Sequence, residues 1–578
     1  MYGENNRDSS GKMQDIILVV IIMGITALIN KYTPTKKTED LKEYFNISSD
    51  DEAALIVDNE LSDYKAKIID KKIYVDYKFV HDSLNSRFYW DANENVLLYT
   101  TASDIISAAA DSNSYSVTKQ TNDFGYPIVK ATSDSALIAL DYVKQYSNIT
   151  FKSYDDPARI VITSKWDEID SATVSKSTQV RVKGGIKSPI LKEVKKDDKI
   201  TILDSGDKWD KVATEDGVIG YIKSKALSES KKTKLTNPDY EEETFTHIKK
   251  DKDICLAWNQ VTSQSANSKV PQVISSTKGI NVMSPTWFYL NDNNGNLADI
   301  ASKDYVSYCH SQGIEVWGLF SNFENTDVDA AYVLTHTSTR TTLINQIMSA
   351  AFNYELDGVN IDFENITEAA YGDSYIEFIR ELAIKCHNNG ISLSVDVTVP
   401  ASFNKFFNRS DMANFADYIV IMGYDEHYKG SDAGSVSSIP WVTEGVESTL
   451  KEVPADQIIL GMPFYTRIWE LTPKEDDDAV TDTEDQSKYT VASQVYSMDA
   501  AAAQLATNNA TAALDEESGQ NYAEWSVSNK LYKVWLEDTT SLEKRLKLVD
   551  DNKLAGAAFW KLGFENSSVW DTVIKYLN

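Results

Sequence analysis

The sequence predicts an α/β protein in which smaller domains precede a carboxy-terminal (β/α)8 barrel. The chain has 578 residues, too many for one hydrophobic core, so we expect several domains. From about residue 240, short apolar runs alternate with helix-like stretches, and there are eight such units. Eight strand–helix units predict a closed parallel barrel, whose active site lies at the carboxyl ends of its strands. Before it we expect an apolar helix, an α+β repeat region and a small β-barrel.

The composition excludes some classes of function. The formal net charge of −30 argues against sequence-independent binding to nucleic acid, which needs basic patches. Cys255, Cys309 and Cys386 are too few and too scattered for a disulfide framework, so we expect buried free thiols rather than a nucleophile. The six histidines show no close metal-binding spacing, so we predict no metal site and no cofactor.

The amino end contains an apolar run at residues 16–29, interrupted only by Gly24 and Thr26. It is short for a full membrane span, which needs about 17–25 residues, and it would suit a signal peptide. Because no small-x-small cleavage site follows, we expect an uncleaved signal-anchor helix at 16–32, with residues 1–15 in the cytoplasm and the rest of the chain outside. Secretion after cleavage is the alternative. The flanking lysines do not favour this orientation, but a large domain can translocate despite them.

Residues 48–166 contain an internal repeat. Residues 75–80, VDYKFV, are echoed by residues 138–143, IALDYV, so the offset is 138 − 75 = 63. Each unit is typical of a strand, a short helix, a strand, a turn and a strand, and two such units can complete one core. The region resembles the copper-amine-oxidase amino-terminal-like modules of exported bacterial proteins, although no metal ligands are evident in it.

Residues 171–230 contain short alternating strands at 180–182, 199–203, 209–212 and 218–222, separated by Gly and Asp turns. This pattern predicts a small barrel, and the segment resembles a bacterial SH3-like domain. That resemblance leaves two roles open: binding of cell-wall peptides, or a spacer. Residues 228–234 are polar and lysine-rich, as in a linker.

The barrel is expected over residues 240–578. Its candidate strands are mostly apolar, as strands covered on both faces must be: 254–258, 279–285, 315–320, 358–364, 392–397, 418–422, 458–463 and 555–560. Helices are expected at 304–311, 374–388 and 541–550. The break at about 471–537, between strands seven and eight, predicts an inserted α+β subdomain along one side of the cleft. It contains an acidic run at 475–478, an alanine-rich helix near 500–506 and a strand at 531–535.

The fourth strand carries the most informative motif, LDGVNIDFEN at residues 356–365. Apolar and polar residues alternate, so Asn360, Asp362 and Glu364 share one face. Two acids and an amide that face one space are costly unless the space is wet or does chemistry. A solvated face of an edge strand is the ordinary alternative, but the end of a fourth barrel strand is where this fold places catalytic groups. Asp357 has the opposite parity and is expected to be structural.

Residues 240–578 resemble glycoside hydrolase family 18, in particular its bacterial spore-cortex and cell-wall branch. Residues 357–364, DGVNIDFE, correspond to the family pattern DGxDxDxE. Residues 422–425, MGYD, after strand six and Trp560 at the end of strand eight are similar to other site elements of the family. Asn360 replaces the middle aspartate; it can still hydrogen-bond Asp362, so we expect activity that is tuned rather than lost.

The resemblance implies a substrate-assisted mechanism with retention. Glu364 would be the general acid and then the base, while the 2-acetamido oxygen of the substrate attacks the anomeric carbon. Asp362 would orient the acetamido group, and Tyr424 would hydrogen-bond its carbonyl, unless it is a core tyrosine. Repulsion between Asp362 and Glu364, and partial burial, should raise the pKa of one of them.

Further residues are candidates for binding the sugar. Trp560 would stack beneath the reacting ring. Trp287, like Trp258, lies near a strand end, and for both tryptophans core packing is an equal alternative. The predicted substrate-binding set is Trp560, Asn360, Met422, Asp425, Trp287 and Asn322.

The sequence therefore predicts a chitinase-like glycosidase that is anchored in the membrane and acts outside the cytoplasm. Its expected partner is an N-acetylglucosamine polymer, with cell-wall peptidoglycan ahead of chitin. A non-catalytic sugar-binding or wall-organising protein on the same barrel is the main alternative; such relatives typically lack the acid, and Glu364 is present. An endoglycosidase that acts on glycoprotein glycans also remains open.

Overall fold

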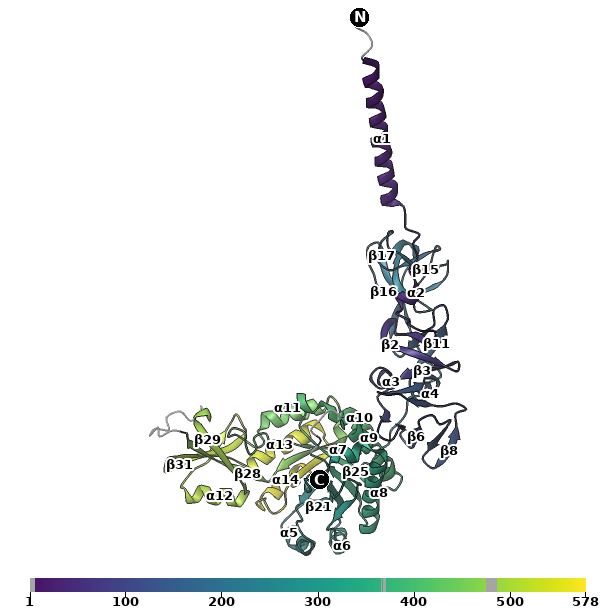
Figure 1. Ribbon diagram of the computed structural model, residues 1–578. Helices are drawn as coiled ribbons and strands as arrows, with labels where there is room; N and C mark the ends of the chain where they lie inside the picture. Colours follow the sequence, from purple (N-terminus) through teal and green to yellow (C-terminus); the bar gives the residue numbers. More distant parts are fainter. Residues whose placement is uncertain (1–5, 365, 367–370, 475–485, 578) are drawn as a thin grey trace. The chain divides into compact units, whose positions relative to one another are not determined.

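The computed structural model describes residues 6–364, 366, 371–474 and 486–577 (Figure 1). The chain divides into two compact units. The amino-terminal unit comprises Met1–Phe88, Ala109–Ser114 and Asp123–Glu242; the barrel unit comprises Tyr89–Ala108, Tyr115–Asn122 and Glu243–Asn578. The acidic run predicted at 475–478 lies outside the described residues.

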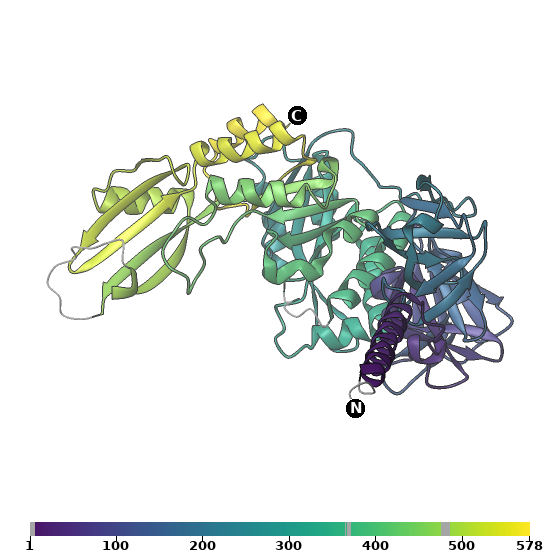
Figure 2. The same ribbon diagram turned by 90° about the horizontal axis from the view of Figure 1, so that it is seen from above.

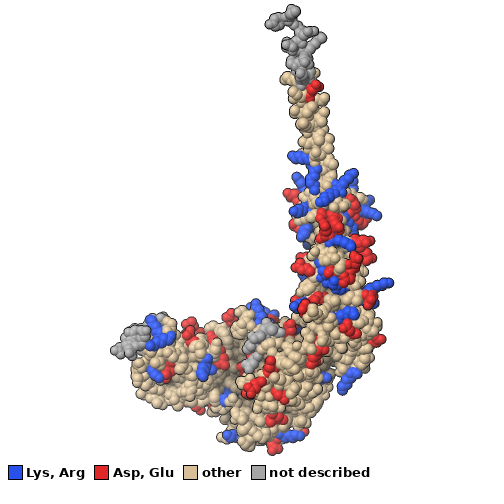
Figure 3. Space-filling view, viewed as in Figure 1, with Lys and Arg blue, Asp and Glu red and all other residues tan. Residues whose placement is uncertain are grey.

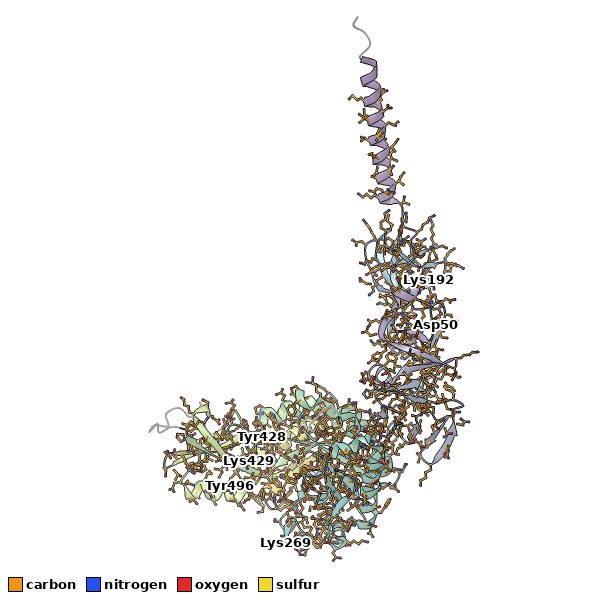
Figure 4. The ribbon with its side chains drawn as sticks, viewed as in Figure 1. Asp50, Lys192, Lys269, Tyr428, Lys429 and Tyr496 are labelled. Atoms are coloured by element: carbon orange, nitrogen blue, oxygen red, sulfur yellow. The ribbon has the colours of Figure 1, made fainter. Side chains whose placement is uncertain are left out.

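The chain begins with a long helix, α1 (Asn6–Tyr32). Its segment Met13–Tyr32 has a mean hydropathy of 2.1 and is unburied, so by length and composition it could cross a membrane. Figure 3 shows an uncharged stretch along this helix, and Figure 4 shows its side chains standing out into open space. A helix of this hydropathy near the amino terminus fits either a signal-anchor or a signal peptide.

The residues that follow α1 join the edge of a seven-stranded sheet in the amino-terminal unit. Backbone N–H groups of Thr35 and Glu39 donate to the carbonyls of Ile186 and Ile190. The strand order is β15-β14-β18-β17-β16-β13-β19, and every pair is antiparallel. The strands are β13 (Glu168–Thr173), β14 (Thr178–Arg181), β15 (Ile190–Val194), β16 (Lys199–Asp204), β17 (Trp209–Thr214), β18 (Ile219–Lys223) and β19 (Lys231–Lys234). Part of the predicted 228–234 linker is therefore a strand, β19, paired with β13.

The repeat region forms a second seven-stranded sheet, in the order β11-β12-β1-β2-β3-β10-β9. Its elements are α2 (Leu41–Tyr44), β1 (Glu52–Val57), β2 (Glu60–Ile69), β3 (Lys72–Asp76), α3 (Tyr77–Ser83), β9 (Val129–Ala131), β10 (Ala136–Ala139), α4 (Leu140–Tyr146), β11 (Thr150–Tyr154) and β12 (Arg159–Thr163). Strands β3 and β10 pair antiparallel with Val75 opposite Ile138, so the two copies of the repeated sequence meet at equivalent residues.

The two sheets of this unit share one hydrophobic core. Phe45, directly after α2, and Ile56 of β1 pack with Val180, Ile200 and Val212 of the other sheet, and all five side chains are buried. The two segments that the sequence suggests as separate domains are therefore joined by common packing.

Eight parallel strands close the barrel, in the order β20-β33-β27-β26-β25-β24-β23-β21, with β20 also paired to β21. They are β20 (Ile254–Asn259), β21 (Val282–Leu290), β23 (Glu315–Ser321), β24 (Gly358–Asp362), β25 (Ser392–Thr398), β26 (Tyr418–Met422), β27 (Ile458–Pro463) and β33 (Gly556–Trp560). A short strand, β22 (Leu297–Asp299), pairs antiparallel with β21. The predicted (β/α)8 fold is confirmed.

Helices surround the barrel (Figure 1). They are α5 (Val270–Val273), α6 (Lys303–Ser311), α7 (Ala330–Thr335), α8 (Thr337–Tyr354), α9 (Gly372–His387), α10 (Arg409–Phe415), α11 (Ile439–Thr449), α13 (Thr539–Asn552) and α14 (Val569–Tyr576). Cys255, Cys309 and Cys386 are free and buried, as predicted, and burial raises the pKa of the Cys255 thiol to about 12. Thiols in such surroundings are structural rather than reactive.

A five-stranded sheet is inserted between β27 and α13, as predicted. It has the order β29-β28-β32-β31-β30 and one helix, and it stands at one side of the barrel (Figures 1 and 2). Its elements are β28 (Tyr465–Pro473), β29 (Tyr489–Ser497), α12 (Met498–Thr507), β30 (Ala513–Asp515), β31 (Gln520–Val527) and β32 (Lys530–Leu536). It begins at residue 465, a few residues before the predicted break.

Part of the repeat region belongs to the barrel unit. This part is mostly a five-stranded sheet. Its strands are β4 (Phe88–Asp91), β5 (Val96–Thr100), β6 (Ile105–Ala109), β7 (Ser114–Val117) and β8 (Gln120–Asp123). The Tyr89 hydroxyl lies 2.8 Å from Ser374 Oγ on α9, and Thr100 Oγ1 donates to Glu377 at 2.7 Å on the same helix. These contacts support α9, the helix that follows β24.

Candidate active site

A cleft of about 820 Å³ lies at the carboxyl ends of the barrel strands. Carboxyl and aromatic groups dominate its lining, and no lysine or arginine is among the described residues that form it. The acids are Glu324, Asp362, Glu364, Asp396, Asp425 and Glu426, and the aromatic side chains are Trp258, Tyr289, Phe323, Phe403, Tyr424, Tyr428, Trp441 and Trp560. A cleft of this composition favours neutral or cationic ligands with apolar faces.

Strand β24 brings Asp362 and Glu364 to this cleft. Asp362 is the last residue of the strand, and Glu364 follows two residues later. Asp362 is 6% exposed, and its Oδ1 has no hydrogen-bond partner among the described residues, whereas Glu364 is exposed to the cleft. The strand is held close to its neighbour because Gly358 has no side chain: a Cβ there would lie 2.5 Å from the Trp317 ring.

The pKa values of both carboxyl groups are raised. Burial raises the pKa of Asp362 well above its usual value, and the nearby charges of Asp396 and Glu364 add to the effect. Burial also raises the pKa of Glu364, and the charges of Asp425 and Glu324 add to it. A carboxylic acid that stays protonated in a wet cleft can donate a proton to a leaving group.

Asn360 lies beneath the cleft rather than in it, which corrects the expectation that it contacts substrate. Its side chain is fully buried. Its hydrogen bonds go to three other strands, and Asp362 is not among the partners. Oδ1 accepts from Trp258 Nε1 at 3.0 Å and from Ser284 Oγ at 2.9 Å, and Nδ2 donates to Ser394 Oγ at 3.0 Å and to Asp396 Oδ1 at 2.7 Å.

Asp396 is a cleft residue that the sequence analysis did not single out. It lies on β25, is 3% exposed, and lines the cleft together with Asp362 and Glu364. Residues 392–398, SLSVDVT, alternate in the same way as β24, with Ser392, Ser394 and Asp396 on one face. That alternation could have indicated Asp396, because polar side chains that face the interior of a barrel need hydrogen-bond partners there.

The segment after β26 places Met422, Tyr424 and Asp425 in the lining of the cleft. The Tyr424 ring meets Trp258 edge to face at a centroid distance of 6.4 Å, and burial raises the pKa of its hydroxyl well above the usual value. Asp425 has a left-handed φ of 60°, accepts a hydrogen bond from the Tyr465 hydroxyl at 2.5 Å, and lies 3.6 Å from Arg467. The inserted sheet, through β28, therefore holds one wall of the cleft.

Trp560, at the end of β33, also lines the cleft, and its ring packs against Trp258 at 6.0 Å and an interplanar angle of 65°. Three exposed aromatic side chains extend this lining outwards: Phe323, Phe403 and Tyr428, the last of which is labelled in Figure 4. Phe323 and Tyr428 come from loops and Phe403 from a short 3-10 helix (Ser402–Phe407), segments in which a periodic pattern gives no signal.

Trp287 and Asn322 are not among the residues that line the cleft. Trp287 lies on β21, but its side chain is fully buried in the hydrophobic core that includes Tyr305 of α6. Its Nε1 donates to Asn267 at 2.8 Å, and its ring packs on Tyr305 at 4.8 Å. Its neighbour Thr286 faces the cleft instead, because successive strand residues point to opposite sides and the register of β21 shifts there. Asn322 is 4% exposed. Both predictions of substrate contact are corrected.

Asp357 holds the opposite end of the strand. Its Oδ2 accepts from the backbone N–H of Val316 at 2.8 Å and lies 2.8 Å from His310 Nε2. This agrees with the expected structural role. In the described parts of the chain, no group of three or more His, Cys, Asp and Glu side chains is arranged to hold a metal ion.

A parallel eight-stranded barrel that carries buried carboxyl groups at the end of its fourth strand, in a cleft lined by aromatic rings, has the features of a glycosidase. Residues 323–565 match the family described as "Glycosyl hydrolases family 18". The barrel therefore matches glycosyl hydrolase family 18 over residues 323–565, and this match supports a glycosidase.

Named relatives match about half of the chain. A Bacillus subtilis protein named "Uncharacterized glycosylase YvbX" is 24% identical over 302 residues, which are 49% of this chain and 81% of the relative. The "Cortical fragment-lytic enzyme" of Bacillus subtilis is 24% identical over 287 residues; the match spans 48% of this chain and 63% of that enzyme.

Solved structures resemble part of the chain at low identity. The spore cortex-lytic enzyme SleL of Bacillus megaterium QM B1551 has a TM-score of 0.48 and 19% identity, covering 60% of this chain and 77% of that one. A chitinase from Chromobacterium violaceum ATCC 12472 has a TM-score of 0.48 and 20% identity, covering 56% of this chain and 98% of that one.

Proposed function

We propose that this protein hydrolyses β-linked polymers that contain N-acetylglucosamine, with retention, by a substrate-assisted mechanism. The observation that carries the proposal is the meeting of Asp362 and Glu364, from one strand end, with Tyr424 and Trp560 in a single acidic, aromatic cleft. Sugar rings have apolar faces that stack on aromatic side chains, and carboxyl groups between such faces are the usual means of glycosidic cleavage.

Glu364 is the proposed general acid. It faces the cleft, and burial together with the charges of Asp425 and Glu324 raises its pKa, in the direction that a general acid requires. It protonates the glycosidic oxygen while the acetamido oxygen of the substrate attacks the anomeric carbon. The resulting carboxylate of Glu364 then removes a proton from the incoming water.

Asp362 is the proposed partner of the acetamido group. Its unpartnered Oδ1 is available to accept the acetamido N–H, and its negative charge would balance the positive charge that develops on the oxazolinium ion. The hydroxyl of Tyr424 would donate a hydrogen bond to the acetamido oxygen. Met422, Asp425 and Trp560 would line the subsite of the reacting sugar, with the Trp560 ring beneath it.

Peptidoglycan is the proposed polymer, ahead of chitin. The preference rests on the rest of the chain: an apolar helix, followed by an amino-terminal unit that resembles bacterial surface modules. Similarity to a relative named for lysis of cortical fragments supports it. We propose that α1 anchors the protein in the membrane and that the amino-terminal unit is the spacer that carries the barrel into the wall.

The direct test compares the full-length protein with Glu364→Gln on purified cell wall, by release of reducing ends. We expect release by the native protein and a loss of at least about a hundredfold in the variant, the range for removal of a general acid. Glu447→Gln is the matched control, because Glu447 is exposed on α11, away from the cleft lining. Equal release by the native protein and Glu364→Gln would disprove the role of Glu364.

A further inference from the structure

Two adjacent barrel strands place a pair of carboxyl groups side by side. Strands β24 and β25 pair parallel, with Asn360 opposite Ser394 and Ile361 opposite Val395. Two residues beyond Asn360 is Asp362, and two residues beyond Ser394 is Asp396, so both aspartates continue the same inward-facing rows. Neighbouring strands lie about 4.8 Å apart, so the two side chains enter the cleft as neighbours.

Asn360 fixes one member of this pair. An amide side chain can accept two hydrogen bonds and donate two, and Asn360 makes all four. Its shortest bond is the donation to Asp396 Oδ1, at 2.7 Å. Because every position is used, the amide cannot turn without breaking buried bonds, and the carboxyl group of Asp396 is held in one orientation.

The rest of the surroundings leaves the pair without a counter-ion. The titratable groups that face it are Glu364, Glu324 beyond β23, Tyr424 after β26, and Tyr375 on α9. None of these is cationic, and no cation in the described part of the chain acts on either aspartate. Burial raises the pKa of Asp396, as it does that of Asp362. Two neighbouring buried carboxyl groups without a cation cannot both be ionised at low cost.

We propose that Asp396 is a positioning residue of the active site: held by Asn360, it controls the ionisation of Asp362 and thereby the step in which Asp362 engages the acetamido group. In a motif with aspartate at position 360, the second carboxyl group beside Asp362 would come from β24. Here it is Asp396, from β25. The activity readout of this inference rests on the proposed function.

The pairing of residue types at 360 and 396 supports the inference. An amide at 360 donates to a carboxylate at 396. A carboxylate at 360 could only accept, and it would face Asp396 as a second anion. Combining Asn360→Asp with Asp396→Asn exchanges the two side chains, so it would restore a donor and an acceptor and would keep one carboxyl group in the network. The two positions are therefore expected to be interchangeable as a pair but not singly.

The test uses full-length Asp396→Asn, Asn360→Asp and the double variant, with a chromogenic N-acetylglucosamine oligomer as the probe. In Asp396→Asn the like charge is lost, so Asp362 ionises more easily, and the acid limb of the kcat profile should move to lower pH by about one unit. We expect kcat at the optimum to fall about tenfold, with KM changed less than about twofold. Asn360→Asp should move the acid limb to higher pH, and the double variant should return it to within about half a unit of the native position.

Ser394→Ala is the matched control. It removes one hydrogen-bond partner of Asn360 without changing a charge, so it should leave the acid limb in place even if thermal stability falls. An unchanged acid limb in Asp396→Asn, or an equal shift in Ser394→Ala, would overturn the proposal. Thermal unfolding of each variant identifies any that has lost its fold.

A second measurement does not depend on turnover. Infrared difference spectra, recorded across the pH range, report the C=O band of protonated carboxyl groups. We expect Asp362→Asn to change the titration of the Asp396 band and Asp396→Asn to change the titration of the Asp362 band. Ser394→Ala should change neither. Independent titration of the two groups would overturn the inference. If the coupling is present but no sugar polymer is cleaved, the proposed function fails and the coupling of Asp396 to Asp362 stands.

Discussion

Trp258 donates a hydrogen bond from its indole Nε1 to Oδ1 of Asn360, at 3.0 Å, across the interior of the barrel. The bond joins the first strand to the fourth. It also links the aromatic floor of the cleft to the strand that carries Asp362, because Trp258 packs against both Tyr424 and Trp560. The hydrogen bonds inside the barrel and the aromatic rings that line the cleft are therefore connected through Trp258.

The first prediction concerns that bond. Asn360→Ala would leave Trp258 Nε1, Ser284, Ser394 and Asp396 without their buried partner, so we expect the free energy of unfolding to fall by about 3 kcal/mol. Denaturant unfolding measures the change. Ser284→Ala removes only one of the four bonds and should cost about 1 kcal/mol; equal losses in the two variants would contradict the central position of Asn360.

The second prediction concerns the pH profile. The charge of Asp425 raises the pKa of Glu364, so Asp425→Asn should lower that pKa. The proposed acid works only while protonated. As the pH rises, activity should therefore be lost earlier than in the native protein, so the alkaline limb of the kcat/KM profile should move to lower pH. Tyr465→Phe removes the hydrogen bond to Asp425 and keeps the charge, so its alkaline limb should move less. An unmoved limb in Asp425→Asn would argue that another group is the acid.

The third prediction separates two tryptophans. Trp560 lines the cleft, so Trp560→Ala should raise KM about tenfold through loss of sugar stacking. Trp287 is fully buried away from the cleft, so Trp287→Phe should lower the melting temperature and leave KM unchanged. Steady-state kinetics with thermal unfolding measures both effects. A raised KM in Trp287→Phe would restore that residue to the binding site.

The fourth prediction concerns the part of the repeat region that belongs to the barrel unit. Thr100 donates to the buried Glu377, which also pairs with Arg380 at 3.0 Å, and Asp91 accepts from the backbone N–H of Thr337 at 2.7 Å. A fragment that starts at residue 240 loses these partners, so we expect it to unfold at a lower temperature than the full chain or to aggregate. Thr100→Val in the full chain should cost about 1–2 kcal/mol. A fragment as stable as the full chain would contradict this assignment.

The sequence allowed much of the barrel to be predicted, because its strands are apolar and its fourth strand alternates. The motif at 356–365 correctly placed Asp362 and Glu364 at the carboxyl end of that strand. It could not show the direction of the Asn360 hydrogen bonds, which depends on the strands that close around it. The alternation of residues 392–398 could have singled out Asp396, but its place beside Asp362 depends on the register of β25 with β24, and register is a tertiary property.

The prediction that Trp287 contacts substrate was wrong because the pairing of β21 with β23 determines which way this side chain faces. The register shift between Thr286 and Phe288 in β21 determines which side chain points inwards, and nothing local to the sequence announces it. The assignment of residues 89–108 to the barrel unit was likewise invisible, since it rests on side-chain contacts such as Tyr89 with Ser374.

Cleavage of a β-linked N-acetylglucosamine polymer by Glu364, with help from the substrate, is the central claim. Mass analysis of the soluble products of a peptidoglycan digest tests it most directly, because it identifies the bond that is cut. We expect fragments whose new reducing end is N-acetylglucosamine, formed by the native protein and absent with Glu364→Gln. Fragments with another reducing end, or equal fragments from both proteins, would contradict the claim.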